Sequence, residues 1–421
     1  MKYENSRALA QSLDNEDPLK EYRSQFHIPQ HQGKDTIYFT GNSLGLQPKS
    51  TRKFVEEELK SWETLGVEGH FEGKRPWMYY HKFSKEHLAK IVGAKPGEVV
   101  SMNNLTSNLH LMMVSFYQPT VDRFKIITEA GAFPSDQYAL ETQIKYHGLD
   151  PEDALIELKP RAGEHTLRTE DILQAIDQAG DQLALVMMAG VQYYTGQFFD
   201  LNSITAKSHE VGAYCGFDLA HAVGNVPVNL HDNDLDFAVW CSYKYMNSGP
   251  GGMSGVFVHE RHADNADLPR FAGWWGHDES QRFQMKKGFI PMSGADGWQL
   301  SNINVLSSAA HLASLEIFEE VGMKALRDKS LKLTGFLSYL LDELKLDESI
   351  LEVITPSAPE ARGCQLSLLV HKNGRKAFDA LTHAGVISDW REPNVIRIAP
   401  VPLYNTFEDA YDFVEILKSA I

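Results

Sequence analysis

Cysteine is scarce in this chain of 421 residues, with only Cys215, Cys241 and Cys364 present. An odd number of cysteines without metal-type spacing argues against a disulfide framework and favours reduced thiols in the cytoplasm. The histidines His209 and His221 also lack the helical spacing of a metal-binding pair, and no carboxylate cluster accompanies them. We therefore expect a cytoplasmic protein without a catalytic metal.

Long apolar runs and an excess of basic residues are missing as well. Apolar runs such as Leu183–Met188 are far shorter than the roughly 20 residues that span a bilayer. The polar start, Met1–Arg7, is not followed by the apolar core of a signal peptide. With 40 Lys and Arg against 56 Asp and Glu, the formal charge of −16 argues against nucleic acid or an anionic membrane as the main partner.

Short apolar strands alternate with helical stretches along most of the chain. The strand-like segments are residues 124–128, 183–188, 213–217, 237–241 and 255–258, and the helical patterns are residues 50–66, 84–92, 109–117, 135–146, 202–211 and 303–322. This alternation predicts an α/β fold with a mainly parallel sheet covered by helices on both faces. Residues 262–300 break the alternation, and their length and aromatic content predict a functional loop.

Two charged residues come at the ends of successive apolar strands. Asp218 ends one strand, and Lys244 follows the next. The spacing fits one crossover of a parallel sheet, whose strands gather ligands at their carboxyl ends. A lysine can form a Schiff base with the aldehyde of pyridoxal phosphate, and a carboxylate keeps that cofactor's ring nitrogen protonated. A lone lysine is more often a solvated charge, so the prediction depends on the combination with other residues.

Two further segments point to the same region. Phe133–Asp136 follows a third predicted strand, and Asn104–Asn108 precedes a helical run. Thr106 or Ser107 could cap that helix or contact the cofactor phosphate, and local sequence alone favours a plain cap. Tyr243 could bind the phosphate or act as a proton donor. The glycine-rich turn at residues 249–252 precedes a strand rather than a helix, which argues against a dinucleotide site.

Motifs spread over nearly the whole chain resemble the kynureninase family, a fold-type-I group of pyridoxal phosphate enzymes related to class V aminotransferases. The matching segments are Tyr38–Leu46, Gly73–Trp77, Phe133–Asp136, Gln192–Gly196, Asp218–Asn225, Trp240–Tyr245, Gly273–His277 and Asn394–Pro402. The resemblance implies hydrolytic Cβ–Cγ cleavage of L-kynurenine, 3-hydroxy-L-kynurenine or both, which yields an anthranilate and L-alanine. The pathway, tryptophan degradation or NAD synthesis, stays open.

Helix and strand patterns alternate again from about residue 325, after the long helical pattern over residues 303–322, which predicts a division of the chain. Residues 51–320 would form a large domain that binds pyridoxal phosphate, and residues 321–421 a small C-terminal α/β domain. The N-terminal segment, residues 1–50, would pack with the small domain. The family also implies a homodimer with shared active sites.

The resemblance assigns roles to individual residues. Lys244 would be the Schiff-base lysine, Asp218 the partner of the pyridine nitrogen, and Tyr243 a catalytic acid. Phe133 would stack on the ring, and other cofactor contacts would come from Leu105, Thr106, Asp136, His221 and, across a dimer interface, Trp274 and Asn302. Arg397 would bind the substrate carboxylate through two parallel hydrogen bonds. The aromatic part of the substrate would be surrounded by Ser43, His70, Trp275 and Asn302.

Some of these assignments have plainer alternatives. Trp274 and Trp275 could be core aromatics, His70 a loop histidine, and Asn302 the N-cap of the following helix. Ala189 departs from the family, where a serine often contacts the cofactor, so a hydroxyl contact is missing there.

Two other functions compete with kynurenine cleavage. Another class V enzyme, a cysteine desulfurase or an aminotransferase, is one, and a desulfurase would need a mobile cysteine, for which Cys364 is the only candidate. A non-catalytic binding protein on the same fold is the other, although such a scaffold would not need Lys244.

Overall fold

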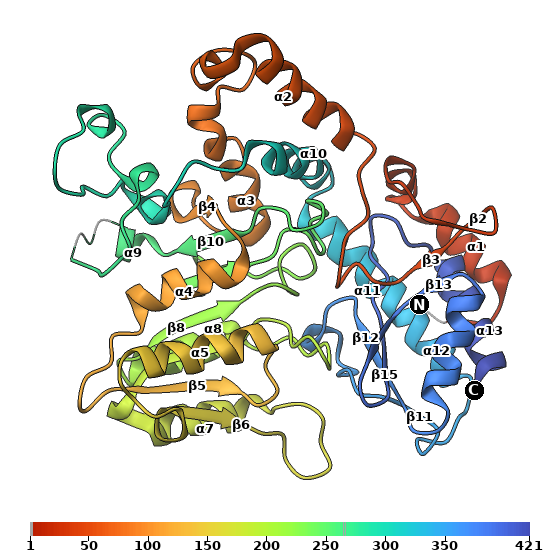
Figure 1. Cartoon of the computed structure of the whole chain (residues 1–421). Coiled ribbons are helices and arrows are strands. Elements are labelled where there is room, and N and C mark those ends of the chain that lie inside the picture. Colours follow the sequence, from red (N-terminus) through yellow and green to blue (C-terminus); the bar gives the residue numbers. More distant parts are fainter. Residues whose placement is uncertain (1–2, 264, 266) are drawn as a thin grey trace.

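The computed structural model describes residues 3–263, 265 and 267–421, and its largest element is a mixed sheet (Figure 1). The strand order is β4-β10-β9-β8-β7-β5-β6. The bounds are β4 Val99–Ser101, β5 Lys125–Glu129, β6 Leu155–Leu158, β7 Leu183–Ala189, β8 Tyr214–Asp218, β9 Phe237–Trp240 and β10 Gly255–Val258. Strands β6, β5, β7, β8 and β9 run parallel, and β10 is antiparallel to both β9 and β4. The predicted α/β fold is confirmed.

Helices cover both faces of this sheet because its central strands are apolar throughout. Along β7, Val186 and Met188 pack into one core, whereas Leu185 and Met187 pack into the core on the opposite face. Helices α4 and α5 contribute to the second core, and α3, α7, α8 and α10 to the first. The bounds are α2 Thr51–Leu65, α3 Lys85–Val92, α4 Leu105–Phe116, α5 Pro134–Tyr146, α6 Pro151–Ala154, α7 Thr169–Ala179, α8 Leu201–Glu210, α9 Glu260–Ala263 and α10 Val305–Val321. A strand buried on both faces reads as a continuous apolar run, which explains why β7 was predictable.

The C-terminal part forms a second, antiparallel sheet of order β11-β12-β15-β14. The bounds are α11 Met323–Asp342, β11 Leu351–Val353, β12 Leu366–Val370, α12 Gly374–His383, β13 Val386–Ile387, β14 Asp389–Arg391, β15 Val395–Ile398 and α13 Phe407–Ala420. Helix α11 begins directly after Gly322, where the predicted helix over 303–322 ends. Gly322 alone therefore separates α10 from α11, and no loop lies between them.

The N-terminal segment contacts this C-terminal part. Its elements are α1 Arg7–Glu16, β1 Gln30–His31, β2 Lys34–Asp35 and β3 Ile37–Tyr38. Helix α1 packs against α13, and β3 pairs in parallel with β13. Ala10, Leu13 and Phe39 share a core with residues of α11 and α13. The division of the chain at residues 50 and 320 stays a prediction. No helix in the described part of the chain is long and apolar enough to cross a membrane.

One close approach inside the large sheet gives a stability prediction. A Cβ atom on Gly216 of β8 would lie 2.1 Å from the ring of Phe237 on β9. Because both residues are buried, Gly216→Ala is expected to lower the free energy of unfolding by about 1–3 kcal/mol. Gly97→Ala is the matched control, since a Cβ there meets nothing within 4 Å. Thermal unfolding of both variants checks this, and equal midpoints would contradict it.

Candidate active site

A pocket opens at the carboxyl ends of β5, β7, β8 and β9, the edge where ligands gather in parallel sheets. Eight residues with predicted roles in catalysis or cofactor binding line it: Leu105, Thr106, Phe133, Asp136, Asp218, His221, Tyr243 and Lys244. Ala189 lines it too, so its side chain offers no hydroxyl at that position. The fold thus brings five distant segments of the chain to one cavity.

Lys244 is one of the residues that line this pocket. The residue follows β9 and is only 9% exposed, and its Nζ donates to Nε2 of His221 at 3.0 Å. Burial, with the nearby Lys244 amine as the next cause, holds the pKa of His221 well below its usual range. His221 is therefore a neutral acceptor for the amine. The Lys244 Nζ also lies 5.8 Å from the centre of the Phe133 ring.

Two buried carboxyl groups of the pocket lie close to each other. Asp218 ends β8 and accepts a hydrogen bond from the Ala220 N–H at 2.7 Å. Asp136, in the first turn of α5, is hydrogen-bonded to Asp218, and such a contact requires one carboxyl to carry the proton. Burial and then the Asp218 charge raise the pKa of Asp136 well above its usual range. Burial raises the pKa of Asp218 as well, but the hydrogen bond from Asp136 and the Lys244 charge oppose that shift. Asp136 is therefore the carboxyl that holds the proton more firmly, and Asp218 is the one that ionises first.

A third carboxyl, Glu129, was missed by the sequence analysis. It ends β5, is 2% exposed and accepts a hydrogen bond from the Ala189 N–H at 3.2 Å. Burial raises the pKa of Glu129 to about 7, and the neighbouring Asp218 charge adds to this shift. A single glutamate at a strand end carries no signal in a sequence, since such residues are usually solvated.

The amino terminus of α4 forms another wall of the pocket. The helix begins at Leu105, and its N-cap is Asn104, whose side chain accepts from the Ser107 N–H at 3.1 Å. The expectation that Thr106 or Ser107 caps the helix was therefore wrong, because both lie inside its first turn. The first N–H groups of a helix have no partner within it, so this terminus suits an anion such as a phosphate. Burial raises the pKa of Tyr243 on the facing wall, so its phenol keeps its proton.

The residues predicted for the aromatic end of the substrate lie elsewhere. His70, Trp274, Trp275 and Asn302 line a second pocket, formed with Phe71, Met78 and Phe283 among others. Asn302 is not the N-cap of α10; that position belongs to Asn304, which accepts from the Ser307 N–H at 3.2 Å. Ser43 is exposed and lines neither pocket.

Arg397 lies behind the wall of the first pocket rather than in it. The residue is on β15 and is only 1% exposed. Its Nη1 donates to the carbonyl oxygen of Tyr193 at 2.6 Å, and its Nη2 pairs with Asp389. Tyr193 lines the pocket and packs edge-on against Phe133, with ring centres 5.2 Å apart. Arg397 thus contacts a residue that lines the pocket.

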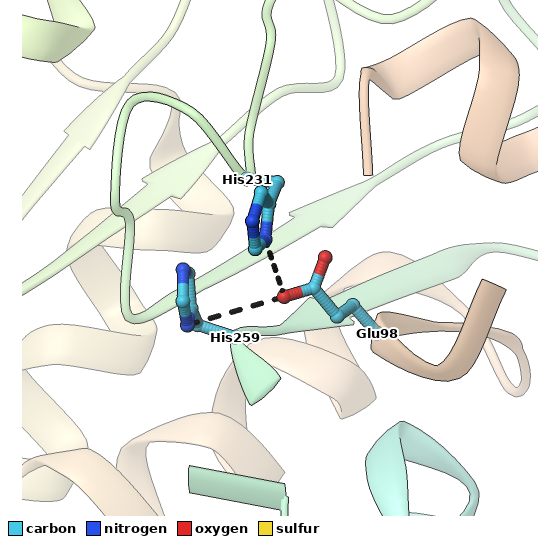
Figure 2. Close-up of side chains that lie close together, drawn as sticks. All are labelled: Glu98, His231 and His259. Carbon is cyan, nitrogen blue, oxygen red and sulfur yellow. Dashed lines mark hydrogen bonds and ion pairs between the residues drawn. The ribbon is translucent and has the colours of Figure 1, made fainter. Parts of the chain in front are cut away.

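Among the described residues, one group could offer three ligands to a metal ion: Glu98, His231 and His259 (Figure 2). It lies at the amino-terminal ends of β4 and β9, the opposite edge of the sheet from the pocket. The two imidazole rings are stacked, with centres 4.9 Å apart and planes 12° apart. Because imidazole binds a metal in its ring plane, two parallel rings do not converge on one ion. Glu98 Oε1 instead lies 2.9 Å from Nδ1 of His231 and accepts from the Glu260 N–H.

Comparisons with known proteins agree with this geometry. Residues 37–367 match the family Aminotransferase class-V, and residues 326–417 match the Kynureninase C-terminal domain. Kynureninase from Flavobacterium psychrophilum is 56% identical over 100% of this chain and 99% of its own. Kynureninase from Myxococcus xanthus is 55% identical over 99% of this chain and 97% of its own. The chain belongs to the kynureninase family.

The kynureninase fold is shared with cysteine desulfurases. The apo structure of the desulfurase from Thermococcus onnurineus has a TM-score of 0.75 at 18% identity, covering 91% of this chain and 94% of that one. A desulfurase from Escherichia coli has a TM-score of 0.75 at 16% identity, covering 95% and 97%. At such identities the likeness shows the fold alone.

The cysteines of this kynureninase-family chain do not suit desulfurase chemistry. A desulfurase needs a mobile nucleophilic thiol, yet all three cysteines are buried. Burial raises the pKa of Cys364 to about 12, so its thiol is not ionised near neutral pH. The desulfurase alternative is therefore not favoured.

Proposed function

We propose that the protein hydrolyses the Cβ–Cγ bond of L-kynurenine, 3-hydroxy-L-kynurenine or both, releasing an anthranilate and L-alanine. The proposal is carried by the amine of Lys244 and the anionic Asp218 in one buried pocket, in a chain related to kynureninases over its whole length. The cofactor is pyridoxal phosphate, which acts as an electron sink when bound. The N–H groups of Leu105 and Thr106 would hold the phosphate, Phe133 would stack on the ring, and Asp218 would pair with the ring nitrogen.

The proton transfers fall to groups around Lys244. Lys244 would hold the cofactor aldehyde and, once free, would remove the α-proton of the substrate, and its hydrogen bond to the neutral His221 keeps the amine in place. Tyr243 keeps its phenolic proton and is the acid that donates to the β-carbon after bond cleavage. The carboxylate of Asp218 would pair with the protonated ring nitrogen, and Asp136 donates a hydrogen bond to Asp218.

The substrate end of the site needs a second copy of the chain. In one chain, the pocket of His70, Trp274, Trp275 and Asn302 is separate from that of Lys244. Several of its large apolar side chains are exposed: Phe71, Trp274 and Phe283 are 55%, 44% and 54% exposed. We propose a homodimer in which this second pocket of one protomer completes the active site of the other, bringing Trp274 and Asn302 to the cofactor and His70, Trp275 and Asn302 to the aromatic ring. Ser43 would join them there.

Purified protein supplied with pyridoxal phosphate tests the function directly. Loss of L-kynurenine and of 3-hydroxy-L-kynurenine is followed together with product fluorescence and alanine release. Cleavage of either substrate into an anthranilate and alanine supports the proposal. Conversion that depends on an added keto acid would identify an aminotransferase, and the absence of cofactor absorbance after reconstitution would favour the non-catalytic scaffold.

Asn302 and His70 give a prediction about substrate choice. Both side chains line one pocket and can hydrogen-bond a hydroxyl group on the aromatic ring. Asn302→Gly is therefore expected to lower kcat/KM for 3-hydroxy-L-kynurenine by about tenfold relative to L-kynurenine, the worth of one buried hydrogen bond. The ratio of kcat/KM for the two substrates checks this, with Asn304→Gly as the neighbouring control. An unchanged ratio would contradict a role in selecting the hydroxyl.

The cellular setting is a further proposal. A cytoplasmic location is supported by the three unpaired thiols. The ratio of rates for the two kynurenines indicates whether the enzyme serves tryptophan degradation or NAD synthesis.

A further inference from the structure

Two arginines share one aspartate beside the active-site pocket. Strands β14 and β15 are antiparallel, and Asp389 lies opposite Arg397 in their register. The Oδ2 of Asp389 pairs with Nη2 of Arg397 and also lies 3.1 Å from Nη2 of Arg391. The cluster therefore holds two guanidinium groups and one carboxylate.

This cluster lies against the wall of the pocket. The guanidinium carbons of Arg391 and Arg397 lie 5.9 and 5.8 Å from the centre of the Tyr193 ring, which lines the pocket. Both charges also act on His221, where they help to lower its pKa after burial and the Lys244 amine. The two arginines thus face the cavity across Tyr193 and His221.

The cluster has two positive charges and one negative charge, and so carries a net charge of one positive unit. The side chain of Arg397 is 1% exposed, that of Asp389 15% and that of Arg391 35%, so water screens these charges only in part. The Nε atoms of both arginines are buried and have no hydrogen-bond partner. Unpaired charges and hydrogen-bond donors in a buried site cost free energy. One more anion with acceptor oxygens would pair with both the excess charge and the free donors.

We propose that Arg391 is a second binding residue for the substrate carboxylate, which joins Asp389 between Arg391 and Arg397. The loaded cluster then has two guanidinium groups and two carboxylates, and the free Nε–H groups gain acceptors. Asp389 is a positioning residue: it touches the arginines and holds Arg397 in place together with the carbonyl of Tyr193. The inference rests on the proposed function, because that function supplies an amino acid as the substrate.

Binding of two small amines separates this role from the cleavage reaction. L-alanine carries the carboxylate, and ethylamine lacks it, and both are titrated against the absorbance of the bound cofactor in the holoenzyme. In Arg391→Gln the dissociation constant for L-alanine is expected to rise about tenfold, which corresponds to one charge-assisted contact. The constant for ethylamine is expected to stay within twofold of the wild type. In steady state, KM for L-kynurenine should rise about as much while kcat changes little.

Charge balance provides a second test. The double variant Arg391→Gln with Asp389→Asn loses one charge of each sign. With one carboxylate bound beside Arg397, the net charge of the cluster is then zero, as in the loaded wild type. It should bind L-alanine at least about threefold more tightly than Arg391→Gln alone, a coupling that a double-mutant cycle measures. Arg375→Gln, an exposed arginine on α12 that pairs with Asp379, is the control and should match the wild type.

The outcomes are distinct. The inference would be overturned if Arg391→Gln weakened the binding of L-alanine and of ethylamine equally, or weakened the binding of neither. The absence of rescue in the double variant would overturn the charge argument. If the wild type binds L-alanine but cleaves neither kynurenine, the proposed reaction is wrong. The comparison of L-alanine and ethylamine binding still tests whether Arg391 binds a carboxylate.

Discussion

Replacing Lys244 with alanine is expected to stop turnover of kynurenine, with a loss of at least about 10³-fold in kcat. The amine of Lys244 is the only lysine amine in the pocket lining of the described residues, and it lies 3.0 Å from the Nε2 of His221. Alanine removes both the covalent attachment of the cofactor and the group that moves the α-proton. No other lysine or arginine lines the pocket in the described part of the chain, so no neighbour takes over. Steady-state rates with saturating pyridoxal phosphate measure the effect.

The variant also has to be shown to be folded. Lys244→Ala should keep the unfolding midpoint of the wild type within a few degrees, because a short polar contact is lost rather than core packing. It should lose the cofactor on dialysis, since the covalent link is absent. Lys60→Ala is the control, as that lysine is exposed on α2 and pairs only with Glu63. Substantial steady-state turnover in cofactor-loaded Lys244→Ala would remove Lys244 from the mechanism.

The sheet could be predicted from sequence wherever its strands are buried on both faces. β7 and β9 have apolar side chains in both cores, so each reads as a run of apolar residues. The strands β4 and β6 were missed for different reasons. β4 is buried throughout but is only three residues long, too short for a pattern to be recognised, whereas β6 lies at the edge of the sheet and is only partly buried. In β6, Glu157 interrupts the apolar pattern on an exposed edge.

The catalytic pocket was predictable because its residues follow strands. Asp218 and Lys244 come at the carboxyl ends of β8 and β9, and parallel topology places such ends together. Individual side-chain contacts left no such trace. The pairing of Arg397 with Asp389, and that of Glu129 with the Ala189 N–H, depend on strand register and burial.

The boundaries of α4 show the limit of local patterns. Asn104, Thr106 and Ser107 are all good N-cap residues, and the sequence alone does not choose among them. Packing decides, because Leu105 and Leu109 are buried in the core beneath the helix and fix its first turn. The choice of Asn104 leaves the hydroxyl of Thr106 free to face the pocket, which it lines.

Replacing Asp218 with asparagine is expected to lower kcat/KM by about 10²–10³-fold, the usual effect of removing one preorganised electrostatic group from an active site. An asparagine has nearly the same shape but no charge, so the ring nitrogen loses the anion that keeps it protonated. Because the pocket is buried, solvent does not replace that charge. Kinetics with L-kynurenine and a pH titration of the absorbance of the bound cofactor measure the loss.

Asp136→Asn is the informative comparison, because the two carboxyls lie together but differ in charge. Burial and the Asp218 charge keep the proton on Asp136, so a neutral amide resembles its native state and can still donate to Asp218. Its loss in kcat/KM is expected to stay within about tenfold, the range of one altered hydrogen bond. If Asp136→Asn is as damaging as Asp218→Asn, the negative charge is shared between the two carboxyls. If only Asp136→Asn is damaging, the anion has been assigned to the wrong residue, and Asp136 would be the group that faces the ring nitrogen.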